Sequence, residues 1–267
     1  MPVTGLARAA FSLIELLVVV AIVALLAAIL LPSLSRARAQ TKEVTCATNL
    51  RTWAQAFYLY ANEYNGTLPH TDDRARNSPP DAYDPDHPEH ECCYIDLLPP
   101  LLNRRPWRDH PDGDKPTGDI WQCPLAIPLP DAAYSPKYQP SVVGYHSYAM
   151  NSYLEHDFPF GLPDGAEPYS SFLQLNRCRA PLKTLLMFEQ TLDPERAYDQ
   201  QGGHPMAGRY TAEDARALSE RHPHVQGRLG ANVIMIDGHL EWRDDLWDES
   251  LGNPRVPSRD DLTWYPY

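Results

Sequence analysis

Two stretches of the chain carry side chains whose types and spacing could bind a metal ion. The first offers soft nitrogen and sulfur ligands, but its spacing matches no standard zinc pattern: His87, His90, Cys92 and Cys93. The second gathers carboxylates around a glycine, in an order that differs from an EF-hand loop: Asp109, Asp112, Asp114 and Asp119. A disulfide therefore explains the first stretch better than zinc does. A solvated acidic loop is the commoner outcome for the second stretch, and calcium is the ligand that such a stretch could bind.

The chain has five cysteines: Cys46, Cys92, Cys93, Cys123 and Cys178. An odd number leaves at least one free thiol or an intermolecular bond if the compartment is oxidising. Adjacent cysteines do not easily bond each other, so we expect Cys92 or Cys93 to pair with Cys123 or Cys178. The sequence alone does not determine the connectivity.

No catalytic constellation is evident in the sequence. It contains no nucleophile motif, no phosphate-binding glycine loop and no pair of carboxylates at an informative spacing. We therefore expect a protein that is not an enzyme. The formal net charge is −12 and no basic patch stands out, which argues against a nucleic-acid partner for this subunit.

A single carboxylate, Glu15, interrupts a long apolar run near the N-terminus. Residues 16–31 are all apolar, and the run counted from Phe11 is broken only by Ser12 and Glu15. As a helix this run would reach about 30 Å, the thickness of the hydrocarbon core of a bilayer. A charge inside such a helix costs about 2.5 to 3.5 kcal/mol at the bilayer centre, so Glu15 is expected to have a cationic partner.

A cleaved signal peptide is the alternative to a membrane-spanning helix. The hydrophobic region of a signal peptide is usually about 7 to 15 residues long, which is shorter than this run. Ala37-Arg38-Ala39 is nevertheless an acceptable cleavage site, and the product would begin at Gln40. Positive charges follow the run, and by the positive-inside rule they would place the body of the protein in the cytoplasm: Arg36, Arg38 and Lys42.

The segment Phe-Ser-Leu-Ile-Glu-Leu-Leu-Val-Val-Val, residues 11–20, resembles the class III signal of type IV pilins and type II secretion pseudopilins. In that family a peptidase removes a short leader before a phenylalanine, which is then N-methylated, and the mature chain has glutamate at its fifth position. Cleavage between Ala10 and Phe11 would make Glu15 the fifth residue. Pro32 would be the twenty-second, where many pilins have a helix-kinking proline. The family usually has glycine where this chain has Ala10.

The resemblance implies partners and a location. Glu15 would neutralise the N-terminal amine of a neighbouring subunit during filament assembly, and the partners would be other subunits, a prepilin peptidase and the membrane. The precursor would cross the inner (cytoplasmic) membrane once, with its N-terminus in the cytoplasm and its head outside, before it enters a filament. This orientation opposes the charge bias, and we follow the resemblance because its motif is the more specific signal.

Beyond Pro32 the sequence predicts that the helix continues as an amphipathic one. Apolar residues recur at three- and four-residue steps: Leu34, Ala37, Val44, Ala47, Leu50, Ala54, Phe57, Tyr58 and Ala61. Asn65-Gly66 is a helix stop, so the helix should run from Phe11 to Tyr64. This divides the chain into a leader (1–10), a transmembrane or filament-core helix (11–34), its amphipathic continuation (35–66) and a globular head (67–267).

The head is expected to contain a small antiparallel sheet with long loops, which makes the fold class α+β and pilin-like. The sequence 232–243 predicts a hairpin with Asp237-Gly238 as a two-residue type I′ turn. Residues 183–189 and 143–149 are the candidate third and fourth strands. The 27 prolines, against 14 glycines, favour long ordered loops around this sheet.

Other segments resemble the pilin-like proteins abundant in planctomycetes and related bacteria: residues 46–69, 121–124 and 147–151. The hairpin also resembles the C-terminal processing-associated motif of those proteins, in which nine residues separate a histidine from Asp-Gly. Here twelve residues separate His224 from Asp237, and fourteen separate His222 from it. Which histidine corresponds stays open, and turn chemistry with loop packing is the alternative role for His224, Asp237, Gly238 and His239.

These observations together predict a prepilin-like subunit that assembles into a type IV pilus or a type II secretion pseudopilus. The resemblance to major pseudopilins, which carry calcium in the head, also favours calcium at the acidic stretch. The alternative is a membrane-tethered or secreted extracytoplasmic binding protein or hydrolase, whose N-terminus is only an anchor or signal peptide. The sequence does not distinguish a pilus from a pseudopilus or an uptake filament.

Overall fold

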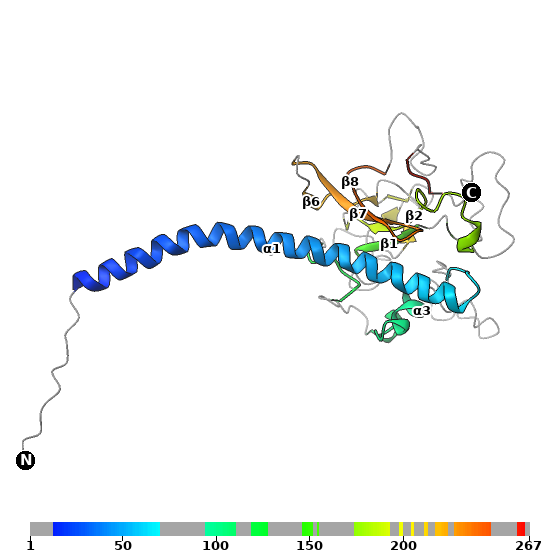
Figure 1. Cartoon of the computed structure of the whole chain (residues 1–267), viewed down its shortest axis with the longest axis horizontal. Coiled ribbons are helices and arrows are strands. Elements are labelled where there is room, and N and C mark those ends of the chain that lie inside the picture. Colours follow the sequence, from blue (N-terminus) through cyan, green and yellow to red (C-terminus); the bar gives the residue numbers. More distant parts are fainter. Residues whose placement is uncertain are drawn as a thin grey trace, which may run out of the picture. The chain divides into compact units, whose positions relative to one another are not determined.

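The computed structural model describes residues 13–69, 94–110, 119–127, 146–151, 154, 174–192, 198–199, 204–205, 211–212, 217–223, 227–246 and 261–264. The chain divides into two compact units, Met1–Lys42 and Glu43–Tyr267. The long helix α1, Leu13–Glu63, belongs to both units, and all other described elements belong to the second (Figure 1).

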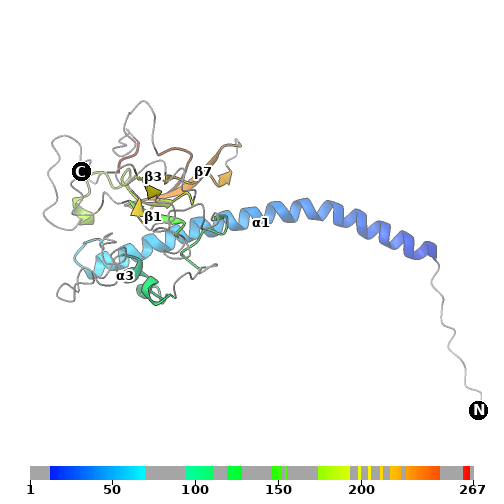
Figure 2. The same ribbon diagram turned by 180° about the vertical axis from the view of Figure 1, so that it is seen from behind.

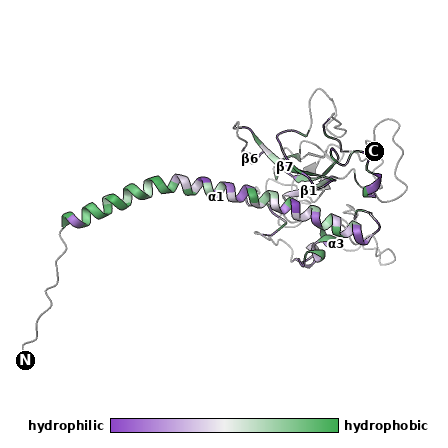
Figure 3. Ribbon diagram, in the orientation of Figure 1, coloured by the Kyte–Doolittle hydropathy of each residue, from purple (hydrophilic) through white to green (hydrophobic). Residues whose placement is uncertain are grey.

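Helix α1 confirms the single long helix that the sequence predicts. Its assignment continues through Pro32, so the kink expected at this residue stays a prediction. The helix stops where predicted, because Asn65 and Gly66 take positive φ angles of 55° and 83° and the Gly66 N–H donates to the Ala61 carbonyl. Apolar residues dominate its first half, and polar residues appear in the second (Figure 3).

The part of α1 within the second unit buries one face in the head. The predicted positions Leu50, Ala54, Phe57 and Ala61 are buried, whereas the side chain of Val44 is exposed. The centre of this face is Trp53, which packs edge-on against Tyr94 and Trp121. Around it lie α3 (Tyr94–Leu101) and the 3-10 turn η2 (Trp107–Asp109).

The head contains a mainly antiparallel sheet with strand order β5-β1-β2-β7-β6, and β8 also pairs with β7. Its strands are β1 (Tyr148–Asn151), β2 (Leu185–Glu189), β5 (Thr211–Ala212), β6 (His222–Pro223), β7 (Leu229–Met235) and β8 (Leu240–Arg243). Among the strands that the structure describes, β1 and β5 are the one pair that runs parallel. Two strands, β3 (Tyr198–Asp199) and β4 (His204–Pro205), form a separate pair, and the 3-10 turn η5 spans Leu175–Arg177. The predicted α+β class with a small antiparallel sheet is thus confirmed.

The sheet lies between two apolar clusters, and the alternation of side chains along β7 assigns its residues to them. Val233 and Met235 join the cluster that also contains Phe188 and Trp264. Ile234 belongs to the other cluster, which contains the buried face of α1. The part of α1 after Lys42 runs beside the strands in both views of the molecule (Figures 1 and 2).

The β7–β8 hairpin is confirmed, but its turn differs from the prediction. The connection has three residues, Ile236 to Gly238, because Met235 pairs with His239 and also accepts a hydrogen bond from the Gly238 N–H. Among these three residues only Gly238 has a positive φ, of 86°, whereas a type I′ turn needs two. The hydroxyl of Tyr58, on α1, donates to the Ile236 carbonyl and so holds this longer turn against the helix.

Candidate functional site

The N-terminal part of α1 exposes an apolar surface on all its sides. Every residue from 13 to 42 is exposed, and large apolar side chains such as Leu13, Ile22 and Leu31 are at least half exposed. Helix α1 is long and apolar enough to cross a membrane, judged by length and composition alone. An apolar surface of this size needs lipid or other protein around it. Glu15 lies in the first turn of α1.

Two predicted processing residues, Ala10 and Phe11, lie outside the described residues. The structure therefore does not test the cleavage site or the methylated residue. Glu15 and Pro32 are both placed on α1, but their predicted roles in assembly and in kinking the helix remain predictions.

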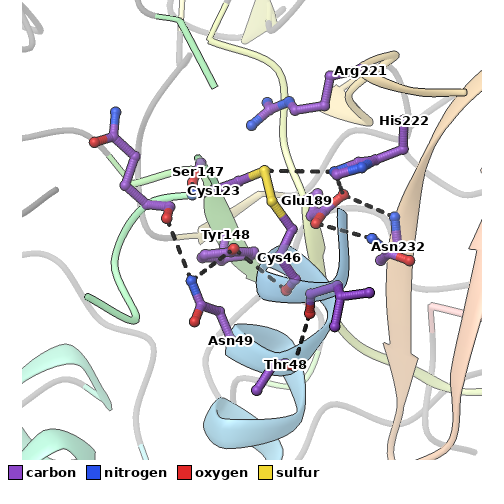
Figure 4. Close-up of a disulfide and its surroundings, with 12 residues drawn as sticks. Cys46, Thr48, Asn49, Cys123, Ser147, Tyr148, Glu189, Arg221, His222 and Asn232 are labelled. Atoms are coloured by element: carbon purple, nitrogen blue, oxygen red, sulfur yellow. Dashed lines mark hydrogen bonds and ion pairs between the residues drawn. A yellow bond between two sulfur atoms is a disulfide. The ribbon is translucent and has the colours of Figure 1, made fainter. Parts of the chain in front are cut away.

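A second candidate site lies inside the head, where Glu189 and His222 form a buried pair. Glu189 ends β2 and His222 begins β6, and both strands pair with the same edge of β7. Their side chains are 0% and 3% exposed, and Nε2 of His222 lies 2.8 Å from Oε2 of Glu189 (Figure 4). Asn232 of β7 fixes the carboxylate, because its backbone N–H donates to Oε2 at 2.9 Å and its side-chain amide donates to Oε1 at 3.2 Å.

A disulfide lies directly beside this pair. It joins Cys46 of α1 to Cys123, and the Cys123 sulfur lies 3.5 Å from Nε2 of His222. The expected pairing of Cys92 or Cys93 with Cys123 is therefore wrong, since Cys123 is bonded to Cys46. The physical reason is tertiary: α1 crosses the head and brings the Cα of Cys46 to 4.9 Å from that of Cys123.

The remaining cysteines are placed only in part. Cys178 is a buried free thiol that donates to the hydroxyl of Thr184 at 3.3 Å. The free thiol that the odd number of cysteines predicts is thus present. Cys92 and Cys93 lie outside the described residues, as do His87 and His90.

Arg221 and Tyr148 complete the surroundings of Glu189. Burial lowers the pKa of Arg221, and the charge of Glu189 counteracts this effect. Burial likewise raises the pKa of the Tyr148 hydroxyl well above its ordinary value, and the charge of Glu189 raises it further. This hydroxyl donates to the Cys46 carbonyl and accepts a hydrogen bond from the Asn49 amide at 3.2 Å. The site is thus a buried network linking α1 to the sheet.

The structure describes the predicted C-terminal motif only in part. His222 lies in the buried pair, whereas His224 lies outside the described residues. Asp237 is in the hairpin turn, where its carboxylate accepts from the backbone N–H of His239 at 3.1 Å and contacts Nδ1 at 2.6 Å. Nε2 of His239 lies 2.9 Å from Glu241. The described contacts of Asp237 and His239 are those of turn chemistry.

The hairpin cluster shifts the pKa values of its members. Burial lowers the pKa of His239, but hydrogen bonds with Glu241 and Asp237 outweigh it and raise the value overall. Burial raises the pKa of Glu241, and its hydrogen bonds with His239 and Arg243 outweigh that effect and lower it. Arg243 also binds Asp261 at 2.7 Å. This surface network therefore favours charged His239 and charged Glu241.

The predicted calcium ligands are only half described. Asp119 binds Arg104 at 3.1 Å and the Ile120 N–H at 2.7 Å, and Asp109 ends η2. Asp112 and Asp114 lie outside the described residues, so the calcium site stays a prediction. Within the described ranges, metal-ligating atoms gather in one group instead: Cys46, Cys123, Glu189 and His222.

Sequence reasoning missed most of this buried network. Glu189 was expected only as the last residue of a strand, and Arg221 and Asn232 carried no assigned role. One signal was available, because Glu189 directly follows four apolar residues of a strand buried along its whole length. A charge in such a position requires a buried partner.

Comparison with known proteins supports the N-terminal signal. A family model, the prokaryotic N-terminal methylation motif, matches residues 6–31. No curated protein and no solved structure matches the chain significantly. The chain therefore carries a prepilin-type signal, and its long apolar helix is consistent with a membrane-anchored precursor.

Proposed function

We propose that this chain is a prepilin-like subunit, cut before Phe11, methylated there, and assembled through α1 into a type IV pilus or a type II secretion pseudopilus. One observation carries the proposal. The methylation motif at residues 6–31 overlaps the part of α1 that is apolar and exposed on all sides. A helix of this kind can pass from lipid into a bundle of identical helices, because both surroundings are apolar.

Glu15 supplies the register of this assembly. The new amine at Phe11 is positive, and the Glu15 carboxylate of a neighbouring subunit is its natural counter-ion in an apolar surrounding. A buried pair is acceptable where a single buried charge is not, so only the helix offset that brings the two together is favoured. Van der Waals packing of the apolar side chains supplies the attraction between helices.

In this proposal the head is a structural and recognition unit rather than a catalytic one. The Cys46–Cys123 disulfide and the Trp53 cluster fasten it to α1. Sliding of the part of α1 after Lys42 against the rest of the head is thereby resisted.

N-terminal sequencing and intact-mass measurement of chain produced with a prepilin peptidase test the proposal. We expect a mature chain that begins at N-methylated Phe11. The variant Ala10→Gly restores the residue that the resembled family has before the cut, and it should increase the fraction of cleaved chain. Phe11→Ala is the matched variant on the other side of the bond.

Two other products would contradict the proposal. A chain beginning at Gln40 identifies an ordinary signal peptide, and a chain that keeps Met1 in the presence of active peptidase identifies a permanent anchor. Both would favour a secreted or membrane-tethered binding protein or hydrolase. The buried face of α1 starts at Cys46, so each product retains the helical residues that pack in the head.

A further inference from the structure

Four buried side chains of the head have the atom types that bind zinc. They are Cys46 and Cys123, which share the disulfide, and Glu189 and His222. Their ligand atoms all lie within 4.8 Å of one another, and none of the four residues is more than 2% exposed. In Figure 4 the imidazole of His222 and the carboxylate of Glu189 both face the sulfur atoms.

The distances approach those of a tetrahedral site. Zinc binds thiolate sulfur at about 2.3 Å and imidazole nitrogen or carboxylate oxygen at about 2.0 to 2.2 Å, so tetrahedral angles separate sulfur from nitrogen by about 3.5 Å. The Cys123 sulfur and Nε2 of His222 are 3.5 Å apart. Nε2 and the Glu189 oxygen, now 2.8 Å apart, would need to open by only about half an ångström.

The two sulfurs are the one part of the set that must move substantially. In a zinc site they lie about 3.8 Å apart, which is incompatible with a bond between them. Rotation about the Cα–Cβ bonds can provide this separation once the disulfide is reduced. The metal and the disulfide are therefore alternatives at the same place.

The charges and the outer contacts suit a divalent cation. The two thiolates and the carboxylate together carry one negative charge more than Zn²⁺ can neutralise. Arg221, beside Glu189, supplies a balancing positive charge. Asn232 already donates to both carboxylate oxygens and so fixes their orientation. Such outer hydrogen bonds position the ligands of metal sites.

The disulfide form alone does not explain why the pair is there. A buried carboxylate–imidazole pair contributes little net stability even when both groups are charged, and apolar residues of similar volume often serve as well or better. Among the described residues, Nδ1 of His222 is buried and has no hydrogen-bond partner, which adds a cost. A second state, in which Nε2 of His222 and the Glu189 carboxylate bind a metal ion, would explain why both residues are present.

We propose that the reduced head binds one Zn²⁺ through Cys46, Cys123, Glu189 and His222, and that forming the disulfide expels it. A dithiol reductant breaks the S–S bond by exchange, becomes a disulfide itself and leaves two protein thiols. Binding Zn²⁺ then releases the two thiol protons. Return to the disulfide needs a disulfide oxidant that accepts two electrons, and it frees the metal. This inference does not depend on the proposed function.

Metal analysis of the full chain in detergent tests the stoichiometry. The chain is reduced with a dithiol in the absence of oxygen, freed of reductant, equilibrated with Zn²⁺ and desalted. We expect one zinc per reduced chain and none on the oxidised chain. With Co²⁺ in place of Zn²⁺, the reduced chain should show thiolate-to-metal charge transfer and the strong visible bands of tetrahedral cobalt.

Variants locate the ligands. His222→Gln and Glu189→Gln should each weaken zinc binding by at least about tenfold, the smallest loss seen when only an outer contact of a metal site is removed. Cys92→Ser/Cys93→Ser is the matched control, since it removes two thiols outside the proposed set, and it should bind zinc like the natural chain. Near-ultraviolet circular dichroism of each oxidised variant, still held by its disulfide, verifies the fold.

A measurement on the unaltered chain keeps the proposal testable if a variant fails to fold. Zn²⁺ should protect Cys46 and Cys123 of the reduced chain from alkylation, as read by peptide mass spectrometry. Failure of the reduced chain to retain zinc would overturn the proposal. So would zinc that is lost with Cys92 and Cys93 but retained without His222, or alkylation of Cys46 and Cys123 at the same rate with and without the metal.

Discussion

At the scale of single residues, Glu189 matters because several donors depend on it. His222 and both nitrogens of Asn232 are directed at one carboxylate that has no contact with solvent. Removal of the carboxylate leaves these groups buried without an acceptor, and the cost of that loss exceeds the net contribution of the intact pair.

We therefore predict that Glu189→Leu destabilises the head by about 3 to 5 kcal/mol, as expected when one partner of a buried pair is removed. Glu189→Gln should cost less, because its carbonyl oxygen still accepts from the Asn232 backbone. Urea denaturation of the oxidised full chain in detergent, followed by tryptophan fluorescence, gives both values. If both variants lost the same unfolding free energy, the hydrogen-bond acceptor at position 189 would not contribute to stability.

The hairpin cluster gives a pH dependence whose sign follows from two shifted pKa values. The pKa of His239 is higher in the folded chain than in the unfolded chain, where it is about 6.5. Its contribution to the unfolding free energy is therefore complete below pH 6.5 and is lost as the pH rises through the folded pKa. The pKa of Glu241 is lower in the folded chain, so its pH dependence has the opposite sign. Its contribution to the unfolding free energy is complete above its pKa in the unfolded chain and is lost as the pH falls through its folded pKa.

We predict that the unfolding free energy of the natural chain, relative to that of His239→Asn, decreases as the pH is raised from about 6.5 into the alkaline range. Because His239 is about one-third exposed, solvent screening limits the difference to about 0.2 to 1 kcal/mol. Urea midpoints of both chains at several pH values measure it. A constant difference across this range would mean that His239 gains nothing from its carboxylate neighbours.

At the scale of elements, the contact of β7 with β8 depends on the absence of a side chain at Gly230. A Cβ there would lie 2.6 Å from the Trp242 ring and would overlap the Arg243 carbonyl oxygen, which is backbone and cannot move aside. Gly230 also accepts from the Arg221 N–H and so connects β6 to the hairpin.

We predict that Gly230→Ala destabilises the head by about 3 kcal/mol, the upper range for overpacking. Gly227→Ala is the matched control, because a Cβ at Gly227 meets no atom within 4 Å and only its positive φ opposes the change. That variant should cost about 1 to 2 kcal/mol. Thermal unfolding of the two oxidised variants compares them, and a larger loss for Gly227→Ala would contradict the close approach.

Features set by neighbouring residues could be predicted from the sequence, whereas features set by distant residues could not. The extent of α1, its stop at Asn65-Gly66 and the hairpin all follow from local spacing. The turn at Asp237-Gly238 was predicted one residue too short, since Tyr58 of α1 also holds it. The Cys46–Cys123 bond spans 77 residues and depends on how α1 lies in the head, which no local pattern reports.

At the scale of the whole molecule, the disulfide closes a long loop between α1 and the rest of the head. On the chain-entropy account, closing a loop with a sequence separation of 77 between Cys46 and Cys123 stabilises the folded chain by about 4 to 5 kcal/mol, because it restricts the unfolded chain. The proposed zinc site would close the same loop in the reduced chain. Either link would tie the second half of α1 to the rest of the head.

The assembly role proposed for Glu15 leads to the last prediction. Glu15→Ala should insert into the membrane normally, because removing a charge from an apolar helix lowers the cost of insertion. Its filament yield should fall strongly, since the Phe11 amine of each incoming subunit then lacks its counter-ion and the helix offset is no longer selected. Membrane fractionation measures insertion, and sheared filaments viewed by electron microscopy measure assembly.

Glu43→Ala is the matched control for this experiment, because it removes a carboxylate from the same helix but beyond the apolar run. It should assemble like the natural chain. Normal filaments from Glu15→Ala would refute the pairing, whereas equal losses from both variants would mean that assembly depends on the total charge of α1. A loss confined to Glu15→Ala, with the chain still cut before Phe11, identifies this carboxylate as the group that sets the register between subunits.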